Sequence, residues 1–259
     1  SLQINIKYSI KTAFIMLSLL YYLVVTTLWF IVYCWSWVAF IVCYPFDKRR
    51  VVVHKLSCLL VDLAFIPAPL MKRKVEGLEN LDPKQTYVIA INHNSMVDIL
   101  ALYKLPLIFK WVSKREVYKI PLVGRLLFMH GDIVINRSNP KEAMQFVHEK
   151  GMKWLKRGAS VSIFPEGTRS KDGEIHNFKA GAFILAKDAG VPILPVVMDG
   201  TNTMARKNML INWRNQITIR VLPPVSAEEV AERSIKEVMN DVHDRMVEAL
   251  ADIRAKKQK

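Results

Sequence analysis

The most restrictive feature of this sequence is an uncharged run of 35 residues from Thr12 to Phe46. It holds no glycine, and its only proline is Pro45. As a helix the run would be about 52 Å long, whereas a bilayer core of about 30 Å needs roughly 20 residues. A single span with no apolar excess would have to tilt by more than about 50°, beyond the usual range. Two complete spans would need more residues and a polar turn, which the run lacks.

A break and a second helix are predicted directly after this run. Pro45 ends the first helix, and Asp47 can cap a helix from about Asp47 to Ile66. Basic residues border the apolar run at both ends, so the positive-inside rule gives almost no preference for opposite sides. We therefore expect residues 1–70 to form a two-helix motif embedded in one leaflet, which makes the protein monotopic. A single long tilted span is the alternative.

The distribution of charge supports membrane association. The formal net charge is +14, and 51% of the residues are hydrophobic, a combination that is unusual for nucleic-acid-binding proteins. Residues 1–74 hold nine basic side chains and two acidic ones. Juxtamembrane cations contribute roughly 1 kcal/mol each toward binding an anionic lipid surface. We expect a bilayer, and no nucleic acid, as the partner of this surface.

The remaining chain, residues 71–259, alternates short apolar runs with helical patterns, which is typical of an α/β domain. Strands are predicted at Lys74–Glu76, Tyr87–Asn92, Phe109–Val112, Asp132–Asn136, Val161–Phe164, Ile193–Met198 and Ile217–Leu222. Helices are predicted at Ser95–Tyr103, Pro121–Met129, Pro140–Lys156, Phe178–Ala189 and about Ala227–Ala255. Pro195 interrupts the sixth of these strands, which favours an edge strand or a bulge.

The stretch "NHNSMVD", residues 92–98, places a histidine and an aspartate five positions apart. One regular helix would hold them roughly 140° apart, so a loop must intervene if they are partners. Ser95 and Asp98 fit the first and fourth positions of a helix capping box, which leaves His93 in the loop before the helix. A carboxylate that holds one imidazole nitrogen makes the other a general base. Plain capping by Asp98 and a merely structural His93 are the alternatives.

The stretch "FPEGTRS", residues 164–170, follows a predicted strand. Turns at the carboxyl ends of strands are where α/β sheets bind ligands. Arg169 is suited to bidentate phosphate binding, and Glu166 can orient a hydroxyl. A bland surface turn is the alternative, and the spacing does not fit a nucleotide P-loop. Arg137 ends a further predicted strand.

Together these stretches resemble the glycerolipid acyltransferase family, and within it the 1-acyl-sn-glycerol-3-phosphate acyltransferases. The resemblance covers about residues 85–200. Four motifs occur in the family's order: N-H-x-x-x-x-D at 92–98, a strand ending in Arg137, F-P-E-G-T-R-S, and V-P-I-x-P-V at 191–196. A weaker K-x-E-x-x-x-I-P-x-x-G pattern begins at Lys114. The fold that the resemblance implies is a mixed sheet flanked by helices.

The activity that the resemblance implies is acyl transfer from a thioester to the sn-2 hydroxyl of lysophosphatidic acid. His93, oriented by Asp98, would be the general base, with no acyl-enzyme. Backbone N–H groups near Ser95 are candidates for the oxyanion site. The residues implied in binding the glycerol phosphate are Glu166, Gly167, Thr168, Arg169, Arg137 and Lys114.

The same resemblance implies no metal and no cofactor, only a co-substrate, acyl-CoA or an acyl-acyl carrier protein. The apolar stretch "IPLVGRLLFM", residues 120–129, would line an acyl tunnel or else form an ordinary core helix. The active site is expected at a membrane, on its cytoplasmic face. The alternatives are an acyltransferase acting on glycerol-3-phosphate or another lysophospholipid, and a non-catalytic protein that binds anionic membranes.

Overall fold

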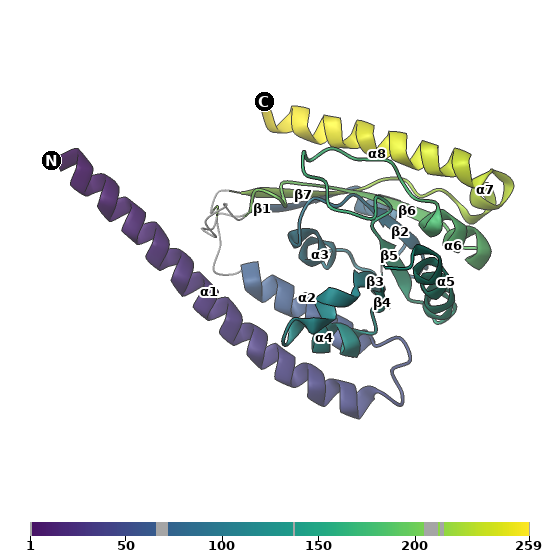
Figure 1. Ribbon diagram of the computed structural model, residues 1–259, viewed down its shortest axis with the longest axis horizontal. Helices are drawn as coiled ribbons and strands as arrows, with labels where there is room; N and C mark the ends of the chain where they lie inside the picture. The colour runs from purple at the N-terminus through teal and green to yellow at the C-terminus, as the bar shows by residue number, and fades with distance from the viewer. Residues whose placement is uncertain (1, 66–71, 137, 205–211, 213–214, 259) are drawn as a thin grey trace.

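The computed structural model describes residues 2–65, 72–136, 138–204, 212 and 215–258, and it has a seven-stranded sheet at its centre (Figure 1). The sheet order is β1-β7-β6-β2-β5-β3-β4, and only β6 and β7 pair antiparallel. The predicted mixed sheet is therefore confirmed. The strands are β1 (Lys72–Glu76), β2 (Val88–Ile91), β3 (Phe109–Lys114), β4 (Ile133–Ile135), β5 (Ser160–Ile163), β6 (Ile193–Asp199) and β7 (Gln216–Val221).

Helices cover both faces of this sheet. They are α1 (Leu2–Cys43), α2 (Val51–Phe65), α3 (Val97–Leu102), α4 (Val123–His130), α5 (Pro140–Lys156), α6 (Gly181–Ala189), α7 (Ala227–Glu232) and α8 (Ile235–Gln258), with 3₁₀ turns η1 (Leu78–Asn80) and η2 (Arg115–Lys119). Side chains from α2 and α3 share one hydrophobic core with the sheet, and side chains from α5, α6 and α8 share the other. Figure 1 shows α8 along one side of the sheet and α2 and α4 on the opposite side.

The final predicted helix is wrong in one respect, because it is two helices, α7 and α8. Each begins with a capping box. Ser226 exchanges hydrogen bonds with Glu229, and Ser234 does the same with Glu237. The second box accounts for the break, since a serine that caps a new helix has extended backbone and cannot continue the preceding one.

The N-terminal segment is one 42-residue helix, α1, followed by a turn and α2, which packs back against it. Asp47 caps α2 by accepting the backbone N–H of Val52 at 2.8 Å. Among the described residues, one helix, over Thr12–Cys43, is long and apolar enough to cross a membrane. Its large side chains are widely exposed, including Met16, Leu23 and Trp35. The predicted boundary between residues 70 and 71 lies outside the described residues.

A chain of buried polar side chains joins α2 to the sheet. Nδ1 of His54, in α2, lies 2.9 Å from Nε2 of His130 at the end of α4. Nδ1 of His130 lies 2.6 Å from Asp132, whose same oxygen accepts the backbone N–H of Trp111 in β3. Burial lowers the pKa of His130. In its neutral form the ring donates Nδ1–H to Asp132 and accepts the Nδ1–H of His54 at Nε2. Lys110, also fully buried, donates to the His130 carbonyl at 2.7 Å.

Candidate active site

The loop after β2 brings His93 and Asp98 into contact. Nδ1 of His93 lies 2.8 Å from Oδ2 of Asp98, so the contact predicted from the sequence is present. The same carboxylate oxygen accepts the backbone N–H groups of Asn94 at 2.7 Å and Ser95 at 2.8 Å. The Asp98 side chain is fully buried, whereas 13% of the His93 side chain is exposed. With Nδ1–H donated to the carboxylate, Nε2 of His93 carries the lone pair of a base.

Helix α3 begins at Val97, two residues later than predicted. The Ser95 hydroxyl accepts the N–H of Val97 at 3.2 Å, while the Asp98 N–H donates to the Ser95 carbonyl, so only the carboxylate half of the predicted capping box forms. The N–H groups of Ser95 and Val97 are both engaged within the loop. The prediction that backbone donors near Ser95 form an oxyanion site is therefore wrong for these two groups.

An aromatic stack, which the sequence did not reveal, fixes the plane of the His93 ring. The ring of Phe164, at the end of β5, lies parallel to the imidazole with centroids 3.9 Å apart. Trp111 of β3 stacks on the far side of Phe164 at 5.2 Å. The stack crosses three neighbouring strands, because β2, β5 and β3 lie side by side. An imidazolium on an aromatic face gains about 0.5–2 kcal/mol.

Glu166 ties the two motif loops together. Its carboxylate accepts the backbone N–H of His93 at 2.9 Å and that of His176 at 3.1 Å. The Ser170 N–H in turn donates to the His93 carbonyl at 2.7 Å. Burial raises the pKa of the Glu166 carboxyl, and the two backbone donors oppose that shift. Glu166 thus positions the backbone that carries His93, while its predicted contact with glycerol stays a prediction.

The other predicted binding residues gather at the same end of the sheet. Thr168 and Arg169 are exposed in the turn after β5, and Lys114 is exposed at the end of β3. The carboxyl ends of neighbouring parallel strands meet at one edge, so these side chains share an edge with His93. Arg137 lies outside the described residues.

Lys179, which belongs to none of the motifs recognised in the sequence, lies beside the same turn. Gly167 has φ of 76°, and a Cβ at this position would come within 2.9 Å of the Lys179 Nζ. Any side chain at position 167 would thus be strained and would push this cation away. Lys179 thus adds a cationic group beside Gly167 of the turn.

An apolar cavity of about 220 Å³ lies between the N-terminal helices and α3 and α4. Five residues of the stretch 120–129 line it: Ile120, Leu122, Val123, Leu126 and Leu127. Trp29 and Tyr33 of α1 line it as well, together with Met96 and Ile99 beside the His93 loop. The stretch is thus both part of a helix that packs on its neighbours and the wall of a cavity.

Comparisons with known proteins place the chain in a family. Residues 72–199 match the acyltransferase family. The chain is 38% identical over 154 residues to the chloroplastic 1-acyl-sn-glycerol-3-phosphate acyltransferase LPAT1 of Arabidopsis thaliana, a match that covers 59% of this chain and 42% of the relative. It therefore spans less than half the length of that relative. With the 1-acyl-sn-glycerol-3-phosphate acyltransferase of Borreliella burgdorferi it shares 30% identity over 181 residues, 70% of this chain and 72% of the relative.

The fold is similar to that of a solved structure. The crystal structure of the 1-acyl-sn-glycerophosphate (LPA) acyltransferase PlsC from Thermotoga maritima superposes with a TM-score of 0.77 at 25% identity. The superposition covers 95% of this chain and 98% of that one, so it includes the N-terminal helices as well as the sheet. The chain belongs to the 1-acyl-sn-glycerol-3-phosphate acyltransferase family.

Proposed function

We propose that the protein transfers a fatty acyl group from an acyl thioester to the sn-2 hydroxyl of 1-acyl-sn-glycerol-3-phosphate, giving phosphatidic acid. The observation that carries the proposal is the His93–Asp98 pair, whose fully buried carboxylate leaves Nε2 of the partly exposed imidazole as a base. The names of the matched relatives in Arabidopsis and Borreliella support the choice of acceptor.

The reaction proceeds by direct attack. Nε2 of His93 removes the proton of the acceptor hydroxyl as that oxygen bonds to the thioester carbonyl carbon. The tetrahedral intermediate collapses with cleavage of the C–S bond, and the imidazolium returns its proton to the thiolate. Asp98 stabilises the imidazolium throughout, and general-base assistance of this kind contributes about 10²–10⁴ in rate. No cofactor takes part in these steps, because the co-substrate, acyl-CoA or an acyl-acyl carrier protein, supplies the acyl group.

The two ends of the lipid substrate bind to different surfaces. Arg169 and Lys114, exposed at the His93 edge of the sheet, bind the glycerol phosphate, and Lys179 assists them. The cavity between α1, α2, α3 and α4 holds an acyl chain, since its walls are almost entirely apolar side chains. A lipid bound in this way keeps its headgroup at the membrane surface and its chain on the side of the N-terminal helices.

The long apolar helix, whose large side chains are exposed, supports membrane association. Burying this surface in lipid is favourable by about 25 cal/mol per Å². We propose further that the protein is monotopic, with α1 and α2 in one leaflet of an anionic membrane and the active site on the cytoplasmic face. Basic residues at both ends of the apolar run support this arrangement.

A panel of acceptors and donors tests the activity. Purified protein in mixed micelles is given acyl-CoA or an acyl-acyl carrier protein, with lysophosphatidic acid, glycerol-3-phosphate or a zwitterionic lysophospholipid as acceptor. We expect phosphatidic acid formation from lysophosphatidic acid to dominate. Preference for another acceptor would replace the proposed substrate, and no transfer to any acceptor would favour a non-catalytic membrane binder.

Two substitutions test the roles of the residues. His93→Ala abolishes turnover while folding and vesicle binding persist; turnover near that of the parent protein would refute the dyad mechanism. Arg169→Ala raises the KM for lysophosphatidic acid more than it lowers kcat, because the phosphate contact is made in the ground state as well. An unchanged KM would remove Arg169 from the phosphate site.

The topology is tested by labelling single cysteines from one side of sealed vesicles. In a cysteine-free background, Ser9→Cys and Lys48→Cys place thiols near the two ends of the apolar run. A membrane-impermeant maleimide labels both positions from the same side if the motif is monotopic. Labelling of only one of them without detergent would establish a span.

A further inference from the structure

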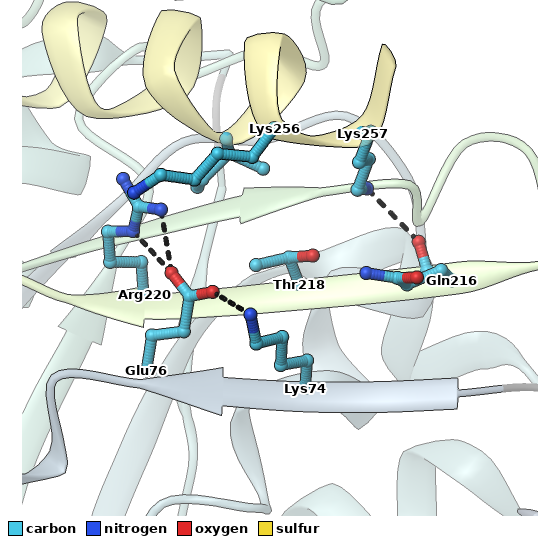
Figure 2. A pocket seen from close by; sticks show the side chains of 8 residues that line it. Lys74, Glu76, Gln216, Thr218, Arg220, Lys256 and Lys257 are labelled. Carbon is cyan, nitrogen blue, oxygen red and sulfur yellow. Dashed lines mark hydrogen bonds and ion pairs between the residues drawn. The ribbon is translucent and has the colours of Figure 1, made fainter. Parts of the chain in front are cut away.

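A second cavity, of about 380 Å³, lies on the face of the sheet that α8 covers (Figure 2). The helices α1 and α2 lie on the opposite side of the sheet (Figure 1). Its lining residues come from three segments: Lys74 and Glu76 of β1, Gln216, Thr218 and Arg220 of β7, and Ile253, Lys256 and Lys257 of α8. We call it the α8 groove. It shares none of its lining residues with the apolar cavity beside the candidate active site.

The residues that line the α8 groove include four basic side chains and one carboxylate, Glu76, and two further carboxylates, Asp252 and Asp199, pair with them from outside the lining. Arg220 is fully engaged, because it contacts Glu76 at 2.6 Å and Asp252 at 2.6 Å. Lys74 and Lys256 are different. Their side chains are 59% and 65% exposed, and each has a single carboxylate partner, Glu76 or Asp252. Exposed ion pairs of this kind are weak, so a doubly charged anion can take over both ammonium groups.

A buried hydroxyl at the floor of the groove lacks a partner. Thr218 is 2% exposed, and its Oγ1 has no hydrogen-bond partner among the described residues. Figure 2 places Thr218 on β7 between Arg220 and Gln216, beneath the lysines of α8. Leaving a buried hydroxyl unsatisfied is costly, and an anion oxygen that accepts its proton removes that cost. The Thr218 hydroxyl is thus a second observation, independent of the charges, that supports the binding of an acceptor oxygen in the α8 groove.

We propose that the α8 groove binds a phosphate monoester. A phosphate monoester carries nearly two negative charges near neutral pH and three acceptor oxygens, enough to meet Lys74, Lys256 and the Thr218 hydroxyl together. Lys257 closes one end of the groove, held by Asp199 at 2.5 Å and by the Gln216 carbonyl at 3.2 Å. Arg220 holds one oxygen of Glu76 at 2.6 Å, and the other oxygen contacts Lys74 at 2.7 Å, so the ligand has to displace Glu76 from Lys74.

Two sources offer this group: a soluble molecule such as coenzyme A, through its 3′-phosphate, or the headgroup of phosphatidic acid. The test reads each lysine separately. Full-length protein in neutral detergent micelles is treated with an amine-reactive ester, and modification rates are measured by peptide mass spectrometry. Coenzyme A is compared with dephospho-coenzyme A, and phosphatidic acid with phosphatidylcholine. Lys84 and Lys236, exposed outside the groove, are internal controls.

We expect a phosphate monoester to slow modification of Lys74 and Lys256 at least 5-fold and to leave Lys84 and Lys236 unchanged. Protection by coenzyme A but not its dephospho form identifies a soluble ligand, and protection by phosphatidic acid identifies a lipid. Thr218→Val keeps every charge and removes the hydroxyl, so the concentration for half-protection should rise about 5- to 10-fold. Equal modification with and without all four compounds, protection of all lysines alike, or an unchanged half-protection concentration in Thr218→Val would overturn the proposal.

Discussion

Replacing Asp98 with asparagine removes the negative charge of the side chain and keeps its size and shape nearly unchanged. Oδ2 of Asp98 accepts three N–H donors, from His93, Asn94 and Ser95, at 2.7 to 2.8 Å. Oδ1 is buried and has no partner among the described residues. If the amide oxygen of an asparagine takes the place of Oδ2, its NH₂ group replaces Oδ1 and is left without an acceptor. That costs about 1–3 kcal/mol.

The catalytic loss follows from the same contacts. Hydrogen bonds to a charged group contribute about 1.5–3 kcal/mol and neutral ones about 0.5–1.5 kcal/mol. The bond to the imidazolium gains most from the charge, because it forms as the proton is transferred. Losing the charge therefore costs about 1–2.5 kcal/mol at this bond. We expect Asp98→Asn to lower kcat/KM for acyl transfer by about 5- to 70-fold, since each factor of ten corresponds to about 1.4 kcal/mol.

The assay is the initial rate of phosphatidic acid formation, measured beside urea unfolding of each variant. Asp188→Asn is the matched control, because Asp188 makes the same kind of contact with His148, at 2.8 Å, on the exposed surface. His93→Ala and the variant that carries both His93→Ala and Asp98→Asn complete a double-mutant cycle. If His93 and Asp98 act as a unit, the double variant is about as slow as His93→Ala alone. A kcat/KM of Asp98→Asn within about 3-fold of that of the parent protein would refute the reasoning. It would also be refuted if the loss in the double variant equals the product of the losses in the two single variants.

Three further predictions follow from neighbouring contacts. Phe164→Leu removes the ring on His93 and should lower kcat about 3- to 30-fold in the same assay, with little change in KM. Arg254 donates to the Gly173 carbonyl at 2.6 Å behind the FPEGTRS turn, so Arg254→Gln should lower kcat/KM about 5-fold while circular dichroism is unchanged. Burial lowers the pKa of Lys110 from 10.5 to about 7. Between about pH 7 and 10 the unfolded chain binds a proton that the folded chain does not, so unfolding free energy rises with pH by at most about 1.4 kcal/mol per unit, and Lys110→Met removes that slope in urea titrations.

Periodicity predicted where every strand of the sheet lies along the sequence, but it could not predict the order of the strands within the sheet. Pro195 illustrates the limit, because it predicted an edge or a bulge, whereas β6 lies inside the sheet between β7 and β2. The Pro195 carbonyl accepts the N–H of Leu222, just beyond the end of β7. The missing N–H therefore faces the point where the antiparallel pairing stops, and it costs at most one bond at the end of the ladder.

In the candidate site as well, contacts within one short stretch of the sequence could be predicted, whereas contacts between segments distant in the sequence could not. The His93–Asp98 contact was predictable, since a strand end, a loop and a first helical turn lie within seven consecutive residues. The Phe164 stack and the hydrogen bond from the His93 backbone to Glu166 were not, because both depend on β5 lying beside β2. The Ser-x-x-Glu pattern at Ser234 was visible in the sequence and would have located the break before α8.

The buried side chains of His54, His130 and Asp132 have a practical consequence for the preparation of a water-soluble form of this protein. Deleting the first 70 residues would remove the ring that lies against His130 and uncover a region that includes the unsolvated ammonium of Lys110. The remainder would lose buried side chains that belong to its own core, among them Val61 and Phe65. Solubility is better sought by replacing exposed apolar side chains on α1 with polar ones, which leaves the contacts of α1 and α2 with the rest of the protein in place.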